Sequence, residues 1–376
     1  MAISIFIELS IVILIAVVVA GIMRLLRQPL VIGYILTGII VSPYFLNIVT
    51  STDAIATFAQ IGIVLLLFMV GLNLNPRIIK DVGKVSLVTG VGQVIFTSVI
   101  GFLIGKLLGF STIVSMYIAV ALTFSSTIII MKLLSDKGDL ETLYGRIAMG
   151  FLIVQDLIVI VILMVISSIP AGIDFATLAL ETALKGIGLL ILLFLISIYL
   201  FPRITQAIAK SQEFLLLFSI GWCFAIASLF YYLNFSIEAG ALLAGITLSL
   251  SPYHYEIGSK MKPLRDFFII LFFILLGSQM VFTNISQYII PILIFSAFIL
   301  IGNPLIVIVL MGLLGYTKRN SFLAGLTVAQ ISEFSLILIA MGVKVGHLTN
   351  DILSLVTIIG LITIAGSTYL ILYANK

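Results

Sequence analysis

Charged residues are scarce in this chain. Only 9% of its 376 residues are Asp, Glu, Lys or Arg, against roughly 25% in a soluble domain, and 62% are hydrophobic. This composition excludes a water-soluble globular protein and predicts an integral membrane protein. The formal net charge is only +4 and the basic residues are spread over many short connections, so the sequence carries no signal for nucleic-acid binding.

Sulfur and imidazole ligands are equally scarce. Cys223 is the one cysteine, which excludes an intramolecular disulfide and makes a cysteine metal site implausible. The two histidines, His254 and His347, fall in predicted connections between apolar segments. We therefore expect no metal site and no cofactor.

Long apolar segments dominate what is present. Bounded by charge, Pro or Gly, they can be counted as thirteen membrane spans and predict an all-α membrane protein without a soluble domain. The N-terminus is interpreted as the first span and not as a removed signal, because it lacks a basic region and a small-residue cleavage site. The spans cover residues 4–23, 30–49, 54–72, 85–104, 111–134, 144–166, 176–200, 213–232, 235–251, 263–281, 287–313, 319–341 and 350–373.

Lys and Arg fall mostly on one side of the predicted membrane. Alternate connections hold sixteen of them on one side and three on the other, Lys106, Lys185 and Lys344. By the positive-inside rule, this split predicts a multi-pass protein of the inner (plasma) membrane with its N-terminus outside and its C-terminus in the cytoplasm.

An internal repeat underlies the spans. GYILTGIIVSP at 33–43 is echoed by GALLAGITLSLSP at 240–252, and LFMVGLN at 67–73 by FILLGSQ at 273–279, with offsets of 206 to 207 residues. Each copy lies seven spans after its counterpart, an odd number, so the copies are inverted. We expect two six-helix halves, about 1–170 and 210–376, joined by a linker helix at about 176–200.

Polar residues interrupt two apolar spans at mid-depth, again 207 residues apart. The interruptions are TFSST at 123–127 and AQISEF at 329–334. Inverted repeats with helices broken at the midplane are typical of secondary transporters. We therefore predict that these two spans are crossed, discontinuous helices.

The centre of span 144–166 is apolar except for Gln155 and Asp156. At ~1.5 Å per residue the span is roughly 34 Å long, enough to cross a hydrocarbon core of ~30 Å, which puts Asp156 near the midplane. A carboxylate there costs about 2.5 to 3.5 kcal/mol, and no Lys or Arg is evident nearby to neutralise it. Such a group suits a site that holds a proton in one step and a monovalent cation in another.

The neighbouring polar side chains are candidate ligands. Thr123, Ser126 and Thr127 could each give a hydroxyl oxygen to the ion, although mid-span hydroxyls also bond to their own helix. The amide oxygen of Gln155 either lines the cavity or packs against another helix.

Three residues are predicted to support the site. Glu333, with Ser332 before it, lies at the second break, where its carboxylate would offset the dipole at the start of a half-helix; ion ligation is the alternative. Asn303 precedes Pro304 in span 287–313. Its amide either faces the cavity or accompanies a proline kink.

Several segments together carry a family resemblance: SSTIIIMKLL, GRIAMGFLIVQD, AGALLAG, KPLRDFFIILFFILLG and QISEF. With them, the chain resembles the monovalent cation:proton antiporter superfamily, specifically the membrane domain of Kef-type potassium efflux antiporters. The resemblance implies an Nha-type fold with a dimerisation domain and a core domain. It also implies homodimers in a lipid membrane and an elevator-like movement of the core.

Two departures accompany the resemblance. At the position of Asn303, many relatives carry a Lys or Arg that pairs with the essential carboxylate. Kef-type chains usually continue into a cytoplasmic nucleotide-binding domain, whereas this chain stops at Lys376 without a G-x-G-x-x-G motif in a strand-turn-helix context. We expect no such domain here, which leaves room for a separate cytoplasmic regulatory subunit.

The resulting hypothesis is an electroneutral antiporter that exchanges one monovalent cation for one proton at Asp156, and therefore not an enzyme. The Gln155-Asp156 pair resembles the potassium-associated branch, while sodium-exporting relatives more often show Asp-Asp; sodium is the alternative. A channel would need a continuous wet pathway, and a transport-inactive sensor would need an output partner. A sodium-coupled organic-anion symporter shares the architecture but needs no lone buried carboxylate.

Overall fold

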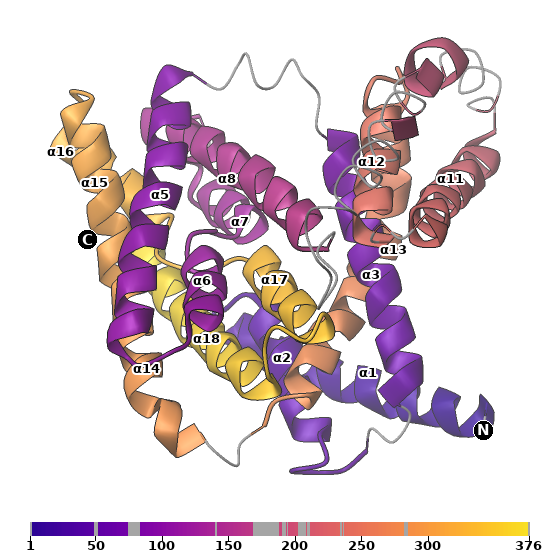
Figure 1. Cartoon of the computed structure of the whole chain (residues 1–376), viewed down its shortest axis with the longest axis horizontal. Coiled ribbons are helices and arrows are strands. Elements are labelled where there is room, and N and C mark those ends of the chain that lie inside the picture. Colours follow the sequence, from indigo (N-terminus) through magenta and orange to yellow (C-terminus); the bar gives the residue numbers. More distant parts are fainter. Residues whose placement is uncertain are drawn as a thin grey trace. The chain divides into compact units, whose positions relative to one another are not determined.

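All regular elements in the described part of the chain are helices (Figure 1). The computed structural model describes residues 2–48, 52–73, 83–139, 141–167, 188–189, 193, 195–201, 208, 211–233, 235, 237–281 and 285–374. The helices are α1 (Ala2–Leu25), α2 (Leu30–Val41), α3 (Thr52–Asn73), α5 (Lys84–Leu107), α6 (Thr112–Ala121), α7 (Thr127–Lys137), α8 (Leu143–Ser167), α11 (Gln212–Tyr232), α12 (Ile237–Ser249), α13 (His254–Ser278), α14 (Ile285–Ala297), α15 (Asn303–Leu313), α16 (Lys318–Leu326), α17 (Glu333–Lys344) and α18 (Asn350–Tyr373), with π-helical turns η1 (Ile196–Leu200) and η2 (Phe298–Gly302).

The all-helical, multi-pass prediction is confirmed. Among the described residues, seven helical stretches are long and apolar enough to cross a membrane, from Ile5–Leu25 near one end to Asn350–Tyr373 near the other. Most of the predicted linker helix, 176–200, lies outside the described residues, so the count of thirteen spans stays a prediction.

Two predicted boundaries are wrong for physical reasons. The second span ends at Val41 and not at residue 49, because Pro43 follows and disfavours helical backbone in the residue before it. The helix predicted at 263–281 already begins at His254. Hydropathy detects only its apolar part, whereas the first turns carry exposed polar side chains such as Glu256 and Lys260.

The chain forms two compact units. Unit 1 comprises Met1–Ser51, Val82–Ile162 and Phe273–Lys376, and unit 2 comprises Thr52–Asp81 and Leu163–Phe272. Each unit draws on both predicted halves of the sequence. The half boundaries themselves stay a prediction.

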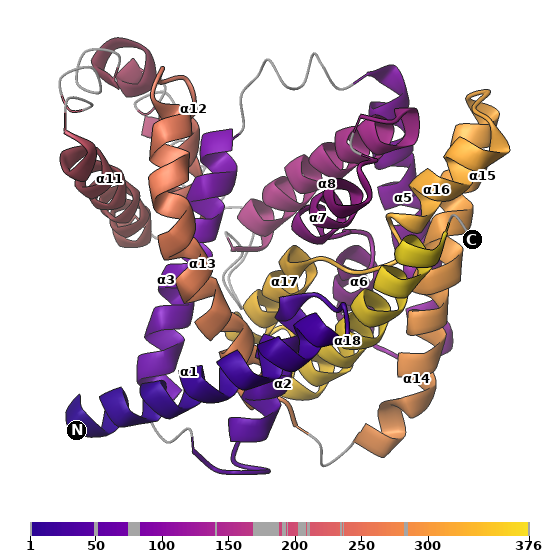
Figure 2. The same ribbon diagram turned by 180° about the vertical axis from the view of Figure 1, so that it is seen from behind.

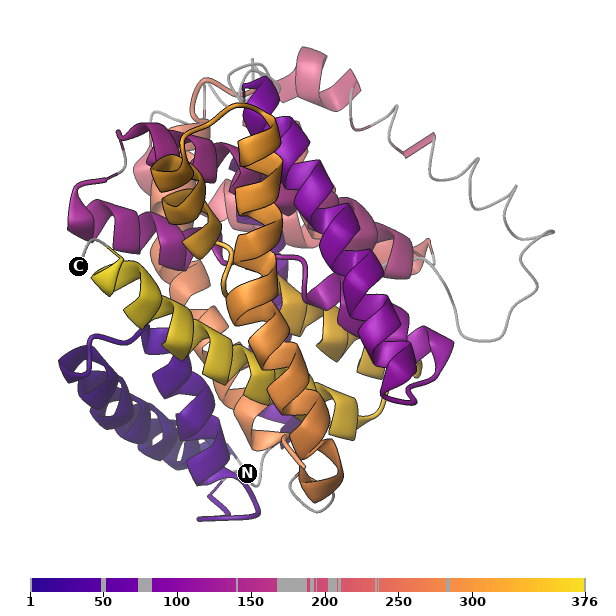
Figure 3. The same ribbon diagram turned by 90° about the vertical axis from the view of Figure 1, so that its left-hand side faces the viewer.

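In unit 1, helices far apart in sequence lie side by side. α6 packs beside α17 (Figure 1), α2 beside α18 (Figure 2), and α5 beside α15 (Figure 3). An apolar core joins α7, α8, α15, α16 and α18, with Phe151, Leu152 and Met311 among its fully buried side chains. Asp156 lies on α8, one turn from this core.

Unit 2 is built around α12, which packs against α3 and α11. The ring of Phe201 meets Trp222 of α11 edge-on, with 4.8 Å between ring centroids. Trp222 Nε1 in turn donates to Thr247 Oγ1 of α12 at 3.0 Å. Aromatic packing and hydrogen bonding thus hold α11 against α12.

Close helix crossings recur at the offset of the sequence repeat. Gly38 of α2 lies against Ile274 and Gly277 of α13 in unit 1. At the corresponding positions in unit 2, Gly245 of α12 lies against Phe68 of α3, and Gly71 of α3 lies against α12. At Gly38 and Gly245 a Cβ atom would overlap a carbonyl oxygen of the partner helix, so glycine is needed at both.

A second matched pair of contacts follows the same offset. A Cβ atom at Gly33 of α2 would press on the backbone of Ala20 of α1. In unit 2, a Cβ atom at Gly240 of α12 would press on Ala227 of α11. Ala227 and Gly240 lie 207 residues after Ala20 and Gly33, as an internal repeat predicts.

Both predicted interruptions are real breaks in the helices. α6 ends at Ala121 and α7 begins at Thr127, while α16 ends at Leu326 and α17 begins at Glu333. Hydroxyl groups replace helical hydrogen bonds at each break: Ser126 Oγ accepts from Ile129 N at 3.2 Å, and Ser332 Oγ accepts from Phe334 N at 3.2 Å.

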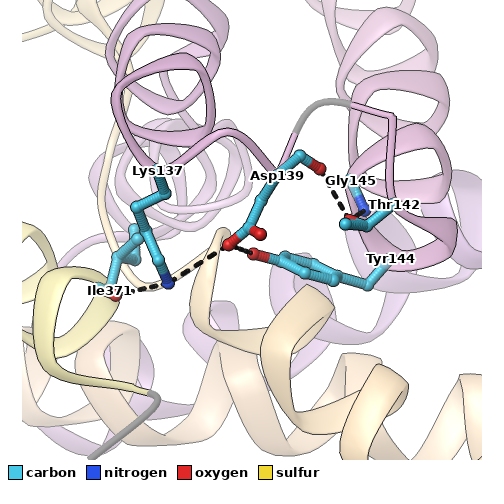
Figure 4. Close-up of polar contacts among 6 residues, drawn as sticks. All are labelled: Lys137, Asp139, Thr142, Tyr144, Gly145 and Ile371. Atoms are coloured by element: carbon cyan, nitrogen blue, oxygen red, sulfur yellow. Dashed lines mark hydrogen bonds and ion pairs between the residues drawn. The ribbon is translucent and has the colours of Figure 1, made fainter.

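A polar cluster fixes the turn between α7 and α8 (Figure 4). Asp139 Oδ2 accepts a hydrogen bond from Tyr144 at 2.5 Å and lies 3.5 Å from Lys137 Nζ. Lys137 Nζ also donates to the carbonyl of Ile371 in the last turn of α18, at 3.1 Å, where a cation offsets the helix dipole. Gly138, with φ of 71°, supplies the left-handed residue that ends α7.

Candidate functional site

Asp156 lies in the middle of α8, beside the start of α7. Thr127 Oγ1 donates to Asp156 Oδ2 at 2.9 Å, and both residues belong to unit 1. Asp156 is only partly buried, and its other oxygen takes no hydrogen bond from the described residues. A neutral hydroxyl thus holds one of the two carboxylate oxygens.

No cation from the protein neutralises this carboxylate within the described part of the chain. The ion pairs found there involve Asp139, just after the end of α7, and Asp266, halfway along α13. Nor do three or more His, Cys, Asp or Glu side chains gather there into a metal-binding group.

Gln155 is fully buried and bonds in two directions. Its Oε1 accepts from the backbone N of Ser125 in the first break at 3.1 Å, and its Nε2 donates to Gln93 Oε1 of α5 at 2.7 Å. The amide nitrogen of Gln155 thus contacts another helix, and the lining of a cavity by its amide oxygen stays a prediction.

Thr123 and Ser126 are buried in the break and bond locally. Thr123 Oγ1 donates to the carbonyl of Val120 at 2.7 Å, and Ser126 Oγ accepts from Ile129 N. Of the three predicted hydroxyl ligands, only Thr127 contacts Asp156. These contacts do not test whether the other two ligate the ion.

Glu333 is the first residue of α17 and is buried. Ser332 caps this helix in a capping box completed by Ser335 Oγ, which accepts from Ser332 N at 3.3 Å. A carboxylate in the first turn stabilises the positive end of the helix dipole. Glu333 also lies within electrostatic reach of Asp156.

Asn303 is fully buried at the start of α15, directly after the π-helical turn η2. This turn accommodates Pro304, which cannot donate a backbone hydrogen bond. Asn303 Nδ2 donates to the carbonyl of Leu122 at 3.1 Å, and its Oδ1 accepts from Thr97 Oγ1 at 2.9 Å. Its amide therefore bonds to the first break and to α5, and not to Asp156.

The sequence analysis missed the contribution of α5. Four buried polar residues follow one face of this helix at intervals of three or four: Ser86, Thr89, Gln93 and Thr97. This spacing is visible in the sequence and would have predicted a polar face turned toward protein. It was overlooked because none of these residues is charged.

The two broken helices contact each other where α6 packs against α17, and a partly buried carboxylate lies in an apolar helix beside them. This arrangement is typical of polytopic membrane transporters of the secondary-carrier class. Sequence comparison gives the family. Over residues 12–372 the chain matches the family described as "Sodium/hydrogen exchanger, transmembrane", and it belongs to that family of transporters.

Several relatives align with most of this chain at low sequence identity. The chain is 29% identical to the iron transporter MagA of Paramagnetospirillum magneticum, covering 96% of this chain and 83% of MagA. It is 28% identical to the putative cation/proton antiporter YbaL of Escherichia coli, covering 86% and 60%. It is 30% identical to the glutathione-regulated potassium-efflux system protein KefC of E. coli, covering 76% and 44%. The chain thus spans less than two thirds of YbaL and KefC.

Among solved structures, the sodium proton antiporter MjNhaP1 of Methanocaldococcus jannaschii is similar. Its TM-score is 0.62 at 18% identity, covering 99% of this chain and 97% of the other. The likeness confirms the predicted Nha-type fold.

Proposed function

We propose that this protein exchanges one monovalent cation for one proton across the membrane, with Asp156 as the site that both ions occupy in turn. The family is one of cation/proton antiporters. The observation that carries the proposal is the Asp156 carboxylate itself. It lies at the centre of an apolar helix, is only partly buried, and receives a hydrogen bond from Thr127 on one oxygen.

The physical reason for exchange is charge. A bare carboxylate at membrane depth costs about 2.5 to 3.5 kcal/mol, so in each step of the cycle the site is more stable with either a proton or a cation bound. Thr127 can supply a neutral oxygen to a cation while it contacts the carboxylate. Competition for one group then couples the two fluxes.

Potassium is our first choice of cation and sodium the alternative. The Gln155-Asp156 pair resembles the potassium-associated branch, and KefC carries potassium efflux in its name. The solved relative MjNhaP1 is named a sodium proton antiporter, but at 18% identity that likeness concerns the fold.

We further infer a homodimer in the inner membrane with the N-terminus outside, from the family resemblance and the distribution of Lys and Arg. An impermeant thiol reagent tests the orientation in a Cys223→Ser background. Thr349→Cys should be labelled in intact cells, and Ser259→Cys only after permeabilisation. The reverse pattern would overturn the orientation.

The test of the proposed function is exchange in proteoliposomes loaded with a pH-sensitive dye. Potassium or sodium added outside should drive protons out, and choline should not. Asp156→Asn, which keeps the shape but removes the titrating group, should abolish the exchange. Asp351→Asn is the matched control, because Asp351 lies in the first turn of α18, outside the site.

Three results would contradict the proposal. Full exchange in Asp156→Asn would exclude Asp156 as the site. Equal losses in the two variants would indicate a general effect of removing an acid. Cation flux without any counterflow of protons would favour a channel.

A further inference from the structure

A chain of hydrogen bonds leads from the first break into α5. It starts at the backbone N–H of Ser125, which donates to Gln155 Oε1 at 3.1 Å. Gln155 Nε2 donates to Gln93 Oε1 at 2.7 Å. Gln93 Nε2 then donates to Thr97 Oγ1, one turn further along α5, at 3.1 Å.

The same chain returns to the break from which it started. Thr97 Oγ1 donates to Asn303 Oδ1 at 2.9 Å, and Asn303 Nδ2 donates to the carbonyl of Leu122 at 3.1 Å. Leu122 and Ser125 both lie in the break, after the end of α6 and before the start of α7. The bonds therefore close a ring, which we call the amide ring, through four side chains and this short piece of backbone.

The amide ring is continuous in one direction. Each of its three amides accepts on oxygen and donates on nitrogen, and the Thr97 hydroxyl does both, so the bonds all point the same way. All four side chains are fully buried. Bonds in such a chain strengthen one another in a low dielectric, and a missing member would leave buried polar groups without partners.

The members of the ring are also uncharged. None of them gains or loses a proton in the working pH range, so the ring keeps its bonds while Asp156 changes its charge. Gln155 directly precedes Asp156 on α8, and Thr127 lies two residues after Ser125. The ring therefore fixes both parts of the backbone that carry the contact between Thr127 and Asp156.

We propose that Gln93 and Thr97 are positioning residues for the ion site, and that they act through Gln155 and Asn303 to hold the first break against α8. The inference rests on the proposed function of Asp156. In this account Gln155 anchors the break and gives no oxygen to the cation. Asn303 serves the same ring in the place where relatives carry a basic partner for the carboxylate.

The test uses three conservative changes on one face of α5. Thr97→Val removes the hydroxyl but keeps the shape, and opens the ring. Thr97→Ser keeps the hydroxyl. Thr89→Val is the matched control, because Thr89 is also fully buried on α5 but its hydroxyl has no hydrogen-bond partner among the described residues.

Two quantities are measured on each variant: the apparent KM for potassium in proteoliposomes, and the potassium concentration that half-saturates thermal stabilisation of the purified protein. Both should rise roughly threefold to tenfold in Thr97→Val, the effect expected from losing a buried hydrogen bond. Thr97→Ser and Thr89→Val should stay close to the unmodified protein. A lower melting temperature alone would not move either quantity.

A second change tests the ring as a unit. Gln93→Leu combined with Thr97→Val should weaken potassium binding little more than either change alone, because one cut already opens the ring. Unchanged potassium affinity in Thr97→Val, or equal effects of Thr97→Val and Thr89→Val, would overturn the proposal. The binding measurement decides this even where exchange is absent, and absent exchange in the unmodified protein would count against the proposed function alone.

Discussion

At the scale of single residues, the two oxygens of Asp156 differ. Oδ2 is held by Thr127, whereas the other oxygen has no hydrogen bond from the described residues. The hydroxyls of Thr123 and Ser126 serve the backbone of the break instead. Removing each of the three neighbouring hydroxyl groups should therefore have a different effect, although the groups are chemically alike.

Thr127→Ala should raise the apparent KM for the cation by roughly tenfold or more, because hydrogen bonds to charged groups are worth ~1.5 to 3 kcal/mol. Thr127→Ser should restore it. Initial rates of exchange at several cation concentrations provide the measurement. An unchanged KM in Thr127→Ala would remove Thr127 from the site.

Ser126→Ala should act on stability instead. Its hydroxyl accepts from Ile129 N near the start of α7, and losing such a cap costs about 1 kcal/mol. A lower melting temperature in detergent with nearly unchanged KM is expected. A large rise in KM with unchanged melting temperature would show that Ser126 ligates the ion.

At the scale of helices, the crossings at Gly38 and Gly245 leave no room for a side chain. Gly245→Ala should destabilise the protein by ~1 to 3 kcal/mol or more, since its Cβ would overlap the carbonyl oxygen of Phe68. Gly21→Ala is the control, because Gly21 has open space around it and alanine favours a helix. Thermal unfolding in detergent compares the two, and equal melting temperatures would contradict the crossing.

Much at this scale could be predicted from the sequence. The breaks at 123–127 and 329–334 were predicted because polar residues interrupt apolar spans, and the glycine crossings recur at the offset of the repeat. The start of α13 could not be predicted, because hydropathy does not detect the polar turns that precede a span. The amide ring could not be predicted either, because spacing along one helix does not identify partners of Gln93 and Asn303 that lie on other helices.

At the scale of the whole molecule, the absence of a basic partner for Asp156 among the described residues bears on the charge moved per cycle. If Asp156 carries one proton one way and one cation the other, no net charge crosses. Exchange in liposomes should balance when the cation gradient equals the proton gradient, at any membrane potential. One elementary charge across 100 mV is worth about 2.3 kcal/mol, so a balance point that shifts with voltage would reveal a second charge, with Glu333 the first residue to examine.

The central claim is that proton and cation compete for Asp156, and the dependence of cation affinity on pH tests it most directly. Thermal stabilisation of the purified protein by potassium gives the apparent affinity at each pH. At high pH the carboxylate is deprotonated and the cation affinity should be constant. At low pH the affinity should weaken by close to tenfold per pH unit, because the protonated carboxyl cannot bind the cation. An affinity independent of pH would show separate sites for the two ions and contradict the account.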